Sequence, residues 1–132
     1  MKKPIKSSER VEWEPGPDMF PEGAEIAILS GDIFDKASRY VFRLRIPKGY
    51  KLPAHNHPTA ENVTVLSGNF HVGMGDQLDE TKCMELTAGA YAQGPANLNH
   101  YSWSSSPTII QLDGDGPFAI SYVNPADDPR NK

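Results

Sequence analysis

The stretch "LPAHNHPTAENVTVLSG", residues 52–68, decides how this chain is interpreted, because it places two of the four histidines one residue apart. Pro53 and Pro58 flank the pair, and proline favours extended or turn backbone over helix. Alternate side chains of an extended strand point to the same face. We therefore expect His55 and His57 to lie close together on one face of a strand.

A carboxylate follows the histidine pair. Glu61 has the same odd numbering as the two histidines, and so do Val63 and Val65 in the next apolar run. We therefore place Glu61 at the start of a strand whose valines line the same interior. Two neutral imidazoles and a carboxylate suit a first-row divalent metal. His100, which follows the turn signals of residues 89–99, is the candidate for a further ligand. The alternative is a polar turn that merely contains imidazoles.

The whole chain has the size and composition of one folded domain. It has 132 residues, of which 38% are hydrophobic and 23% are charged, close to ordinary globular usage. Thirteen basic residues against 17 acidic ones give a net charge of −4. No stripe of lysine and arginine is found of the kind that nucleic acids or anionic membranes attract. We therefore expect neither a nucleic-acid partner nor a membrane partner.

The sequence leaves the cellular compartment open. No run of 18 apolar residues is present, so no membrane-spanning segment is predicted. Cys83 is the single cysteine, and an intramolecular disulfide is therefore excluded. A cytoplasmic location is the default expectation, and a leader peptide removed from the chain would leave export open.

Short runs rich in β-branched and aromatic residues recur between turn residues, and no segment shows a helical period. The predicted strands are residues 25–29, 40–46, 62–66, 70–73, 83–86, 91–93, 98–103, 108–112 and 118–123. Many short strands with little or no helix predict an all-β sandwich or barrel. We divide the chain into an extended N-terminal arm over residues 1–24, a β domain over 25–124 and a polar C-terminal tail over 125–132.

The spacing around the histidine pair resembles the first motif of the cupin family, whose domains are small β-barrels of the jelly-roll type. Gly49 is followed after five residues by His55, then at the family's intervals by His57, Glu61 and Gly68. Every element of that motif is present in this chain.

The second cupin motif is matched less fully. Gly89, Pro95 and His100 stand at the family's intervals, but Asn97 occupies a position where the family usually has glycine. Asparagine tolerates the left-handed backbone better than most residues, so the departure is mild. The two motifs and the strands around them extend the resemblance over about residues 25–124.

The resemblance implies a single divalent metal ion held by His55, His57, Glu61 and His100, with two coordination positions left for water, substrate or dioxygen. Iron is the first expectation, and manganese, nickel, cobalt or zinc would suit the same ligands. The alternative is a cupin domain that kept the turns and lost its metal. His71 has no neighbouring ligand in the sequence, and we interpret it as a solvated or supporting residue rather than a fifth ligand.

Further residues are candidates for substrate binding. Arg43 and Arg45 share one strand face, where they either clamp an anionic substrate or cover the outside of the sheet; alternation favours the outside. Four polar side chains on strands expected to border the pocket either bind a ligand or face outward: Gln93, Gln111, Tyr91 and Tyr122.

Three functions are compatible with this reading. The first is a metal-dependent enzyme acting on a small organic substrate, with an oxygenase preferred. The second is a non-oxidative lyase, isomerase or decarboxylase in which Glu61 also serves as the catalytic base. The third is a non-catalytic module that binds metal or a small ligand. The resemblance also implies a homodimer.

Overall fold

Short strands make up most of the regular structure, as the sequence predicts. The computed structural model describes residues 5–132, so the first four residues of the expected N-terminal arm lie outside the described part. The strands are β1 (Glu14–Pro15), β2 (Glu25–Ser30), β3 (Arg39–Ile46), β4 (Lys51–Asn56), β5 (Glu61–Ser67), β6 (Phe70–Met74), β7 (Met84–Leu86), β8 (Tyr91–Gly94), β9 (His100–Ser104), β10 (Thr108–Asp115) and β11 (Ser121–Tyr122). Single turns of 3-10 helix occur at η1 (Ser8–Arg10), η2 (Glu80–Lys82), η3 (Pro125–Asp127) and η4 (Pro129–Asn131).

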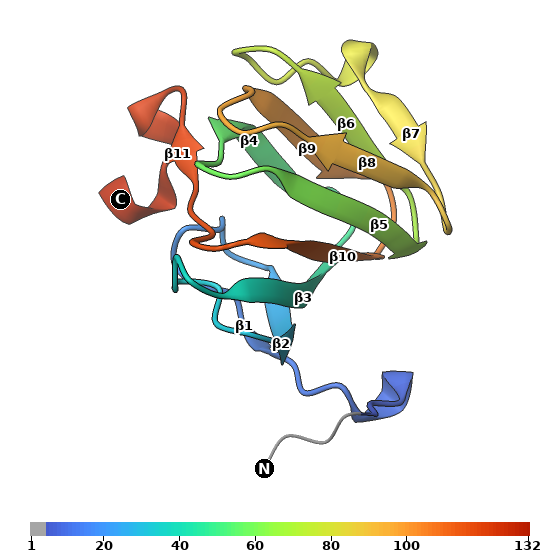
Figure 1. The fold of residues 1–132 in the computed structure, drawn as a ribbon. Coiled ribbons are helices and arrows are strands. Elements are labelled where there is room, and N and C mark those ends of the chain that lie inside the picture. Colours follow the sequence, from blue (N-terminus) through green and yellow to red (C-terminus); the bar gives the residue numbers. More distant parts are fainter. Residues whose placement is uncertain (1–4) are drawn as a thin grey trace.

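The strands form two antiparallel sheets. One has the order β1-β2-β3-β10-β5-β8 and the other the order β11-β4-β9-β6-β7. In Figure 1 the β2, β3, β10 and β5 ribbons form one layer, and β4, β9 and β6 form the other. The all-β jelly-roll prediction is confirmed. Within the described chain, however, the strands are paired as two sheets rather than as one closed barrel.

Most predicted strands begin and end within three residues of the observed ones. The strand predicted over residues 118–123 is the exception, because only β11 is paired there, with β4. Phe118 and Ile120 are buried by packing into the core instead, at 2% and 3% exposure. The apolar residues of this segment therefore indicate that it is buried in the core, not that it pairs as a strand along its whole length.

The hydrophobic core lies between the two sheets, and β3 shows why. Its side chains alternate, so that Tyr40, Phe42, Leu44 and Ile46 are buried while the residues between them face outward. Aromatic rings fill the centre: the Phe118 ring lies 5.1 Å from that of Phe42, edge to face. Such packing leaves the outer face of this sheet to polar side chains.

Segments before β2 and after β11 both contact the sheets. Phe20 is buried in the core, and the Arg45 guanidinium lies 4.4 Å from the centre of the Trp13 ring. After β11, Arg130 donates a hydrogen bond of 2.7 Å to the Ile120 carbonyl oxygen. Among the described residues, no helix has both the length and the apolar composition needed to span a bilayer.

Candidate metal centre

Three histidines from separate parts of the sequence meet inside the domain. His55 near the end of β4 stands directly opposite His100, the first residue of β9. The ring centre of His55 lies 4.3 Å from that of His100 and 4.8 Å from that of His57. One nitrogen of each ring falls within 4.8 Å of the others, and this grouping can hold a metal ion. The predicted convergence of residue 100 on the pair at 55 and 57 is therefore present.

Backbone carbonyls fix the orientation of all three rings. Nδ1 of His55 lies 2.7 Å from Pro53 O, Nδ1 of His57 lies 2.8 Å from Ala119 O, and Nδ1 of His100 lies 2.9 Å from Leu98 O. A carbonyl oxygen only accepts, so Nδ1 carries the proton in each neutral ring and Nε2 keeps its lone pair. This is the arrangement of metal-ligating histidines, whose other nitrogen is held by a hydrogen bond.

Glu61, at the start of β5, brings a carboxylate to the same point. Its Oε2 atom lies 3.2 Å from Nε2 of His57, and its Oε1 atom lies 3.5 Å from Nε2 of His100. The residue is buried, and Oε2 has no hydrogen-bond partner among the described residues. Lone pairs of His57 and Glu61 thus face each other, which is unfavourable unless a cation lies between them. The residues present therefore fit a divalent metal.

The pKa values of the site agree with neutral ring donors at two positions. Burial, together with the neighbouring imidazoles, lowers the pKa of His55 well below its ordinary value. Burial also lowers the pKa of His57, although Glu61 acts in the opposite direction. Burial opposes the charging of His100, but contact with Glu61 outweighs it and raises that pKa. Burial would raise the pKa of Glu61, but His100 and His57 lower it overall.

A cavity of about 150 Å³ opens beside the histidines. Its wall is largely apolar and includes Leu44, Ile46, Val63, Val72, Ile110, Leu112 and Phe118. Met74 also lines it, is 73% exposed and stands opposite His100 in the β6–β9 pairing. The end of the cavity with the three histidines therefore lies near its mouth, and the apolar end lies in the core.

The structure does not bring the predicted arginine to this cavity. Arg43 Nε donates a hydrogen bond of 2.9 Å to Gln111 Oε1, and neither residue lines the cavity. Both project from the outer face of their sheet, where β3 and β10 pair at this position. Arg45 lies on the same outer face and forms an ion pair of 2.9 Å with Glu25.

The remaining polar candidates are also occupied elsewhere. Tyr91 Oη and Gln93 Nε2 both donate to Asn62 Oδ1, at 2.9 and 3.1 Å, and only Gln93 contributes atoms to the cavity wall. Tyr122 donates its hydroxyl proton to Met19 O, although its ring lies 6.1 Å from that of His55. Tyr122 therefore packs behind the candidate ligand His55 rather than at the cavity surface.

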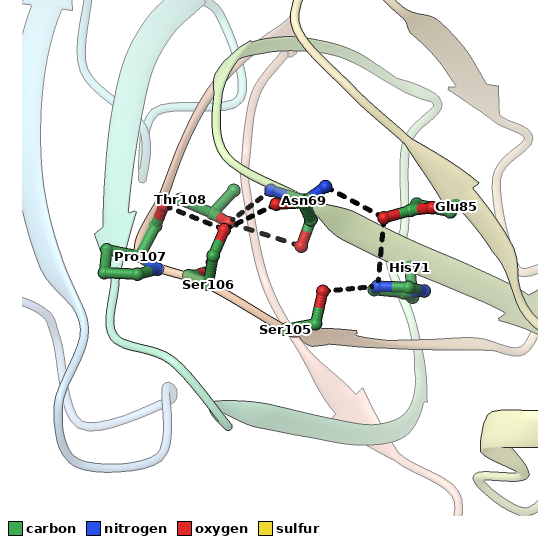
Figure 2. Close-up of polar contacts among 7 residues, drawn as sticks. All are labelled: Asn69, His71, Glu85, Ser105, Ser106, Pro107 and Thr108. Atoms are coloured by element: carbon green, nitrogen blue, oxygen red, sulfur yellow. Dashed lines mark hydrogen bonds and ion pairs between the residues drawn. The ribbon is translucent and has the colours of Figure 1, made fainter.

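His71 lies in a separate polar cluster on the outside of the domain (Figure 2). Its Nε2 atom lies 2.9 Å from Ser105 Oγ and 3.9 Å from Glu85 Oε2, and its ring stacks on Trp103 with centres 4.1 Å apart. Asn69 Nδ2 donates to the same Glu85 oxygen at 2.8 Å. His71 is absent from the three-histidine grouping, which agrees with its interpretation as a residue other than a ligand.

Sequence reasoning missed three residues that contribute to the site. Phe118 places its ring 4.9 Å from that of His57, and Ala119 next to it supplies the carbonyl that orients this histidine. No local pattern connects residue 119 with residue 57. Ser102 lines the cavity from β9, and it shares the parity of His100, so that signal was available.

Solved structures with the same fold were found across a wide range of proteins. A protein from Methylibium petroleiphilum PM1, described as an inferred acetylacetone dioxygenase, is 18% identical over 98% of this chain and 86% of that chain, with a TM-score of 0.70. The polyketide cyclase RemF from Streptomyces resistomycificus is 14% identical over 98% of this chain and 90% of that chain, with a TM-score of 0.73.

A third similar structure is that of Rhodobacter sphaeroides SigE in complex with the anti-sigma ChrR. The matched chain is 24% identical over 83% of this chain and 52% of its own length, with a TM-score of 0.60. At these identities the likeness shows the fold alone. No curated protein matches the chain.

The family itself follows from a match that covers most of the sequence. The model of the ChrR cupin-like domain matches residues 2–119, which include both histidine motifs and every strand from β1 to β10. The cupin resemblance drawn from the motif spacing is thereby confirmed, and this chain belongs to the family of ChrR cupin-like domains.

Proposed function

We propose that this protein is a mononuclear metal-dependent enzyme acting on a small organic substrate, and that it is an oxygenase using iron. The observation that carries the proposal is the convergence of three imidazole nitrogens and one unpartnered carboxylate oxygen at the mouth of an apolar cavity. A closed structural metal site would not need an adjoining cavity.

Each residue has a defined part in this proposal. His55, His57 and His100 hold the ion through Nε2, and their carbonyl-bound Nδ1 atoms keep the rings in place. Glu61 supplies the single negative charge, so a divalent ion remains net positive. When bound, such an ion supplies Lewis acidity and, in the case of iron, reactivity toward dioxygen. The apolar wall binds the carbon skeleton of the substrate and excludes water.

A non-oxidative lyase, isomerase or decarboxylase is the second candidate. The observation that favours it is Oε2 of Glu61, which lies at the cavity and is buried without a hydrogen-bond partner in the described part of the chain. A carboxylate in that position can accept a substrate proton as a general base. The similarity to a polyketide cyclase structure is compatible with this candidate.

The first experiment determines the metal and its open positions. Protein produced without chelating resin is analysed for metals, then stripped, loaded with Fe(II) under argon and exposed to nitric oxide as a stand-in for dioxygen. We expect one iron per chain and the electron paramagnetic resonance signal of a high-spin iron–nitrosyl. Stoichiometric iron without this signal would contradict an oxygenase, and failure to bind any divalent metal would overturn the whole proposal.

A further inference from the structure

The cavity wall beyond the metal end carries no charge. Among residues 5–132, Glu61 is the only Lys, Arg, Asp or Glu side chain that lines it, and the nearby arginines of β3 project from the outside of the sheet. An ionised substrate group placed in this apolar part would be desolvated without a partner. This part of the wall therefore suits an uncharged group of a bound molecule.

One polar side chain nevertheless faces the apolar part. Ser102 lines the cavity and is 5% exposed. Its neighbours across the sheet are Leu52 on β4 and Val72 on β6, and both are apolar. Its hydroxyl makes no hydrogen bond with any side chain or backbone group of residues 5–132.

Other polar residues of the wall differ from Ser102 in this respect. Tyr50 donates its hydroxyl to Pro21 O at 2.6 Å, and Gln93 donates its amide to Asn62. Ser104, the next residue on the same face of β9, does not line the cavity and donates to Pro47 O at 2.6 Å. Buried hydroxyls normally find a partner, so the hydroxyl of Ser102 is available for a ligand.

The position of Ser102 relative to the metal site is set by the strand. It lies two residues after His100 on the same face, which corresponds to about 7 Å along β9. Ser104 beyond it is fully buried, so the direction from His100 to Ser102 leads away from the mouth. A cavity of about 150 Å³ with apolar walls is on the order of the size that holds a benzene ring.

We propose that the substrate is an uncharged molecule about the size of a six-membered carbon ring, with an oxygen at one end for the metal and a hydrogen-bonding group at the other end for Ser102. This inference rests on the metal site of the proposed function and adds the substrate class to it. Ser102 is then a specificity-determining residue that touches the substrate without holding the metal.

The test compares two probes on Zn(II)-loaded protein, in which no redox reaction occurs. Phenol offers one oxygen and hydroquinone offers a second one across the ring, and their dissociation constants are measured by calorimetry under argon. We expect hydroquinone to bind the native protein about 3- to 10-fold more tightly than phenol, the range of one neutral hydrogen bond. In Ser102→Ala this ratio falls to near one.

Two sets of variants separate the hydroxyl from other effects. Ser105→Ala removes a serine hydroxyl from the outer cluster and keeps the native ratio. Threonine and valine have the same shape and differ in the hydroxyl, so Ser102→Thr retains the preference for hydroquinone over phenol and Ser102→Val loses it. This pair provides the test even where Ser102→Ala folds poorly. Zinc stoichiometry shows that each variant retains the site.

A third comparison tests charge. The probe 4-hydroxybenzyl alcohol binds, whereas 4-hydroxybenzylamine, which has the same number of heavy atoms and a positive charge, binds at least 10-fold more weakly. A ratio unchanged in Ser102→Ala and Ser102→Val, or the absence of probe binding to zinc-loaded protein, overturns this inference and leaves the metal proposal standing. Failure of zinc itself to bind overturns both.

Discussion

At the scale of single residues, the candidate metal ligands were the part of the molecule that the sequence predicted most directly. These residues belong to motifs with fixed spacing, and the spacing of residues can be seen directly in a sequence: His55, His57, Glu61 and His100. The sequence did not predict the orientation of the histidine rings. That orientation depends on backbone carbonyls such as the one of Ala119, which lies 62 residues from His57. The polar candidates for substrate binding were chosen without knowledge of which face they occupy, and hydrogen bonds within the outer face hold several of them away from the cavity.

The first prediction concerns the ligands. We expect His57→Ala and His100→Ala to lose metal and to melt at a lower temperature than native protein in the presence of metal. Bound metal stabilises the folded state by mass action, by about 2.7 kcal/mol when free metal is 100-fold above its dissociation constant. Metal analysis and calorimetry of each variant measure both effects.

His71→Ala is the matched control for this prediction. It removes an imidazole that lies in the outer cluster, so metal content and the metal-induced rise in melting temperature stay at native levels. Loss of metal in His71→Ala with retention in His100→Ala would show that the ligand set is assigned wrongly.

The second prediction concerns pH in the metal-free protein. The pKa values of His55 and His57 are lower in the folded state than in the unfolded chain, where imidazole titrates near 6.5. The unfolded chain therefore binds more protons as the pH falls below about 7, and folding stability decreases. His100, with a raised pKa, opposes this, but one group acts against two. Glu61, with a lowered pKa, adds a further loss below about pH 4.5.

Melting temperatures of metal-free protein between pH 7.5 and 5 measure this effect. The free energy of unfolding falls by no more than about 1.4 kcal/mol per pH unit for each extra proton that the unfolded chain binds. A stability that rises steadily over this interval would contradict it.

At the scale of elements, the sequence located strands well where side chains alternate and poorly where the chain is merely buried. β3 alternates along its length and was predicted within one residue. Residues 118–123 are apolar but mostly unpaired, because pairing depends on neighbouring strands that are distant in the sequence. The backbone at Asn97, by contrast, was predictable from a local motif. Its φ of 66° is the left-handed conformation expected at a position where the family usually has glycine.

The third prediction compares two motif glycines. Gly49 and Gly68 both have positive φ, at 80° and 90°. A Cβ at Gly49 would have nothing within 4 Å, whereas a Cβ at Gly68 would lie 2.4 Å from Pro107 O and from Thr108 Oγ1. We expect Gly49→Ala to cost about 1 kcal/mol of unfolding free energy from backbone strain, and Gly68→Ala to cost roughly 2 kcal/mol more.

Denaturant unfolding of both variants measures the difference. Equal losses at the two positions would show that the turn between β5 and β6 moves away from β10 without cost, contrary to the contacts described.

At the scale of the whole molecule, the fold class followed from composition and strand pattern, and the pairing of the strands into two sheets did not. Sheet order is decided by contacts between distant segments, such as β10 lying between β3 and β5. Association with a second copy of the chain likewise depends on which side chains the folded sheets expose, and a sequence pattern shows this only in part.

The fourth prediction is that the protein is a homodimer in solution. β7 and β8 each end a sheet, and large apolar side chains are exposed on both: Met84 at 69% and Tyr91 at 60%. Exposed edges of this kind pair with another chain unless they are protected. We expect sedimentation equilibrium to give twice the chain mass, and Met84→Lys with Tyr91→Lys to weaken the dimer. A monomer at all concentrations up to about 100 μM would contradict the prediction.

The carbonyl of Ala119 has one more consequence. It belongs to the last part of the domain, yet it sets the direction of a ring in the middle of the chain. Trimming or loosening the carboxyl-terminal segment would therefore turn His57 away from its partners, and affinity for an ion would fall although no donor atom had been removed.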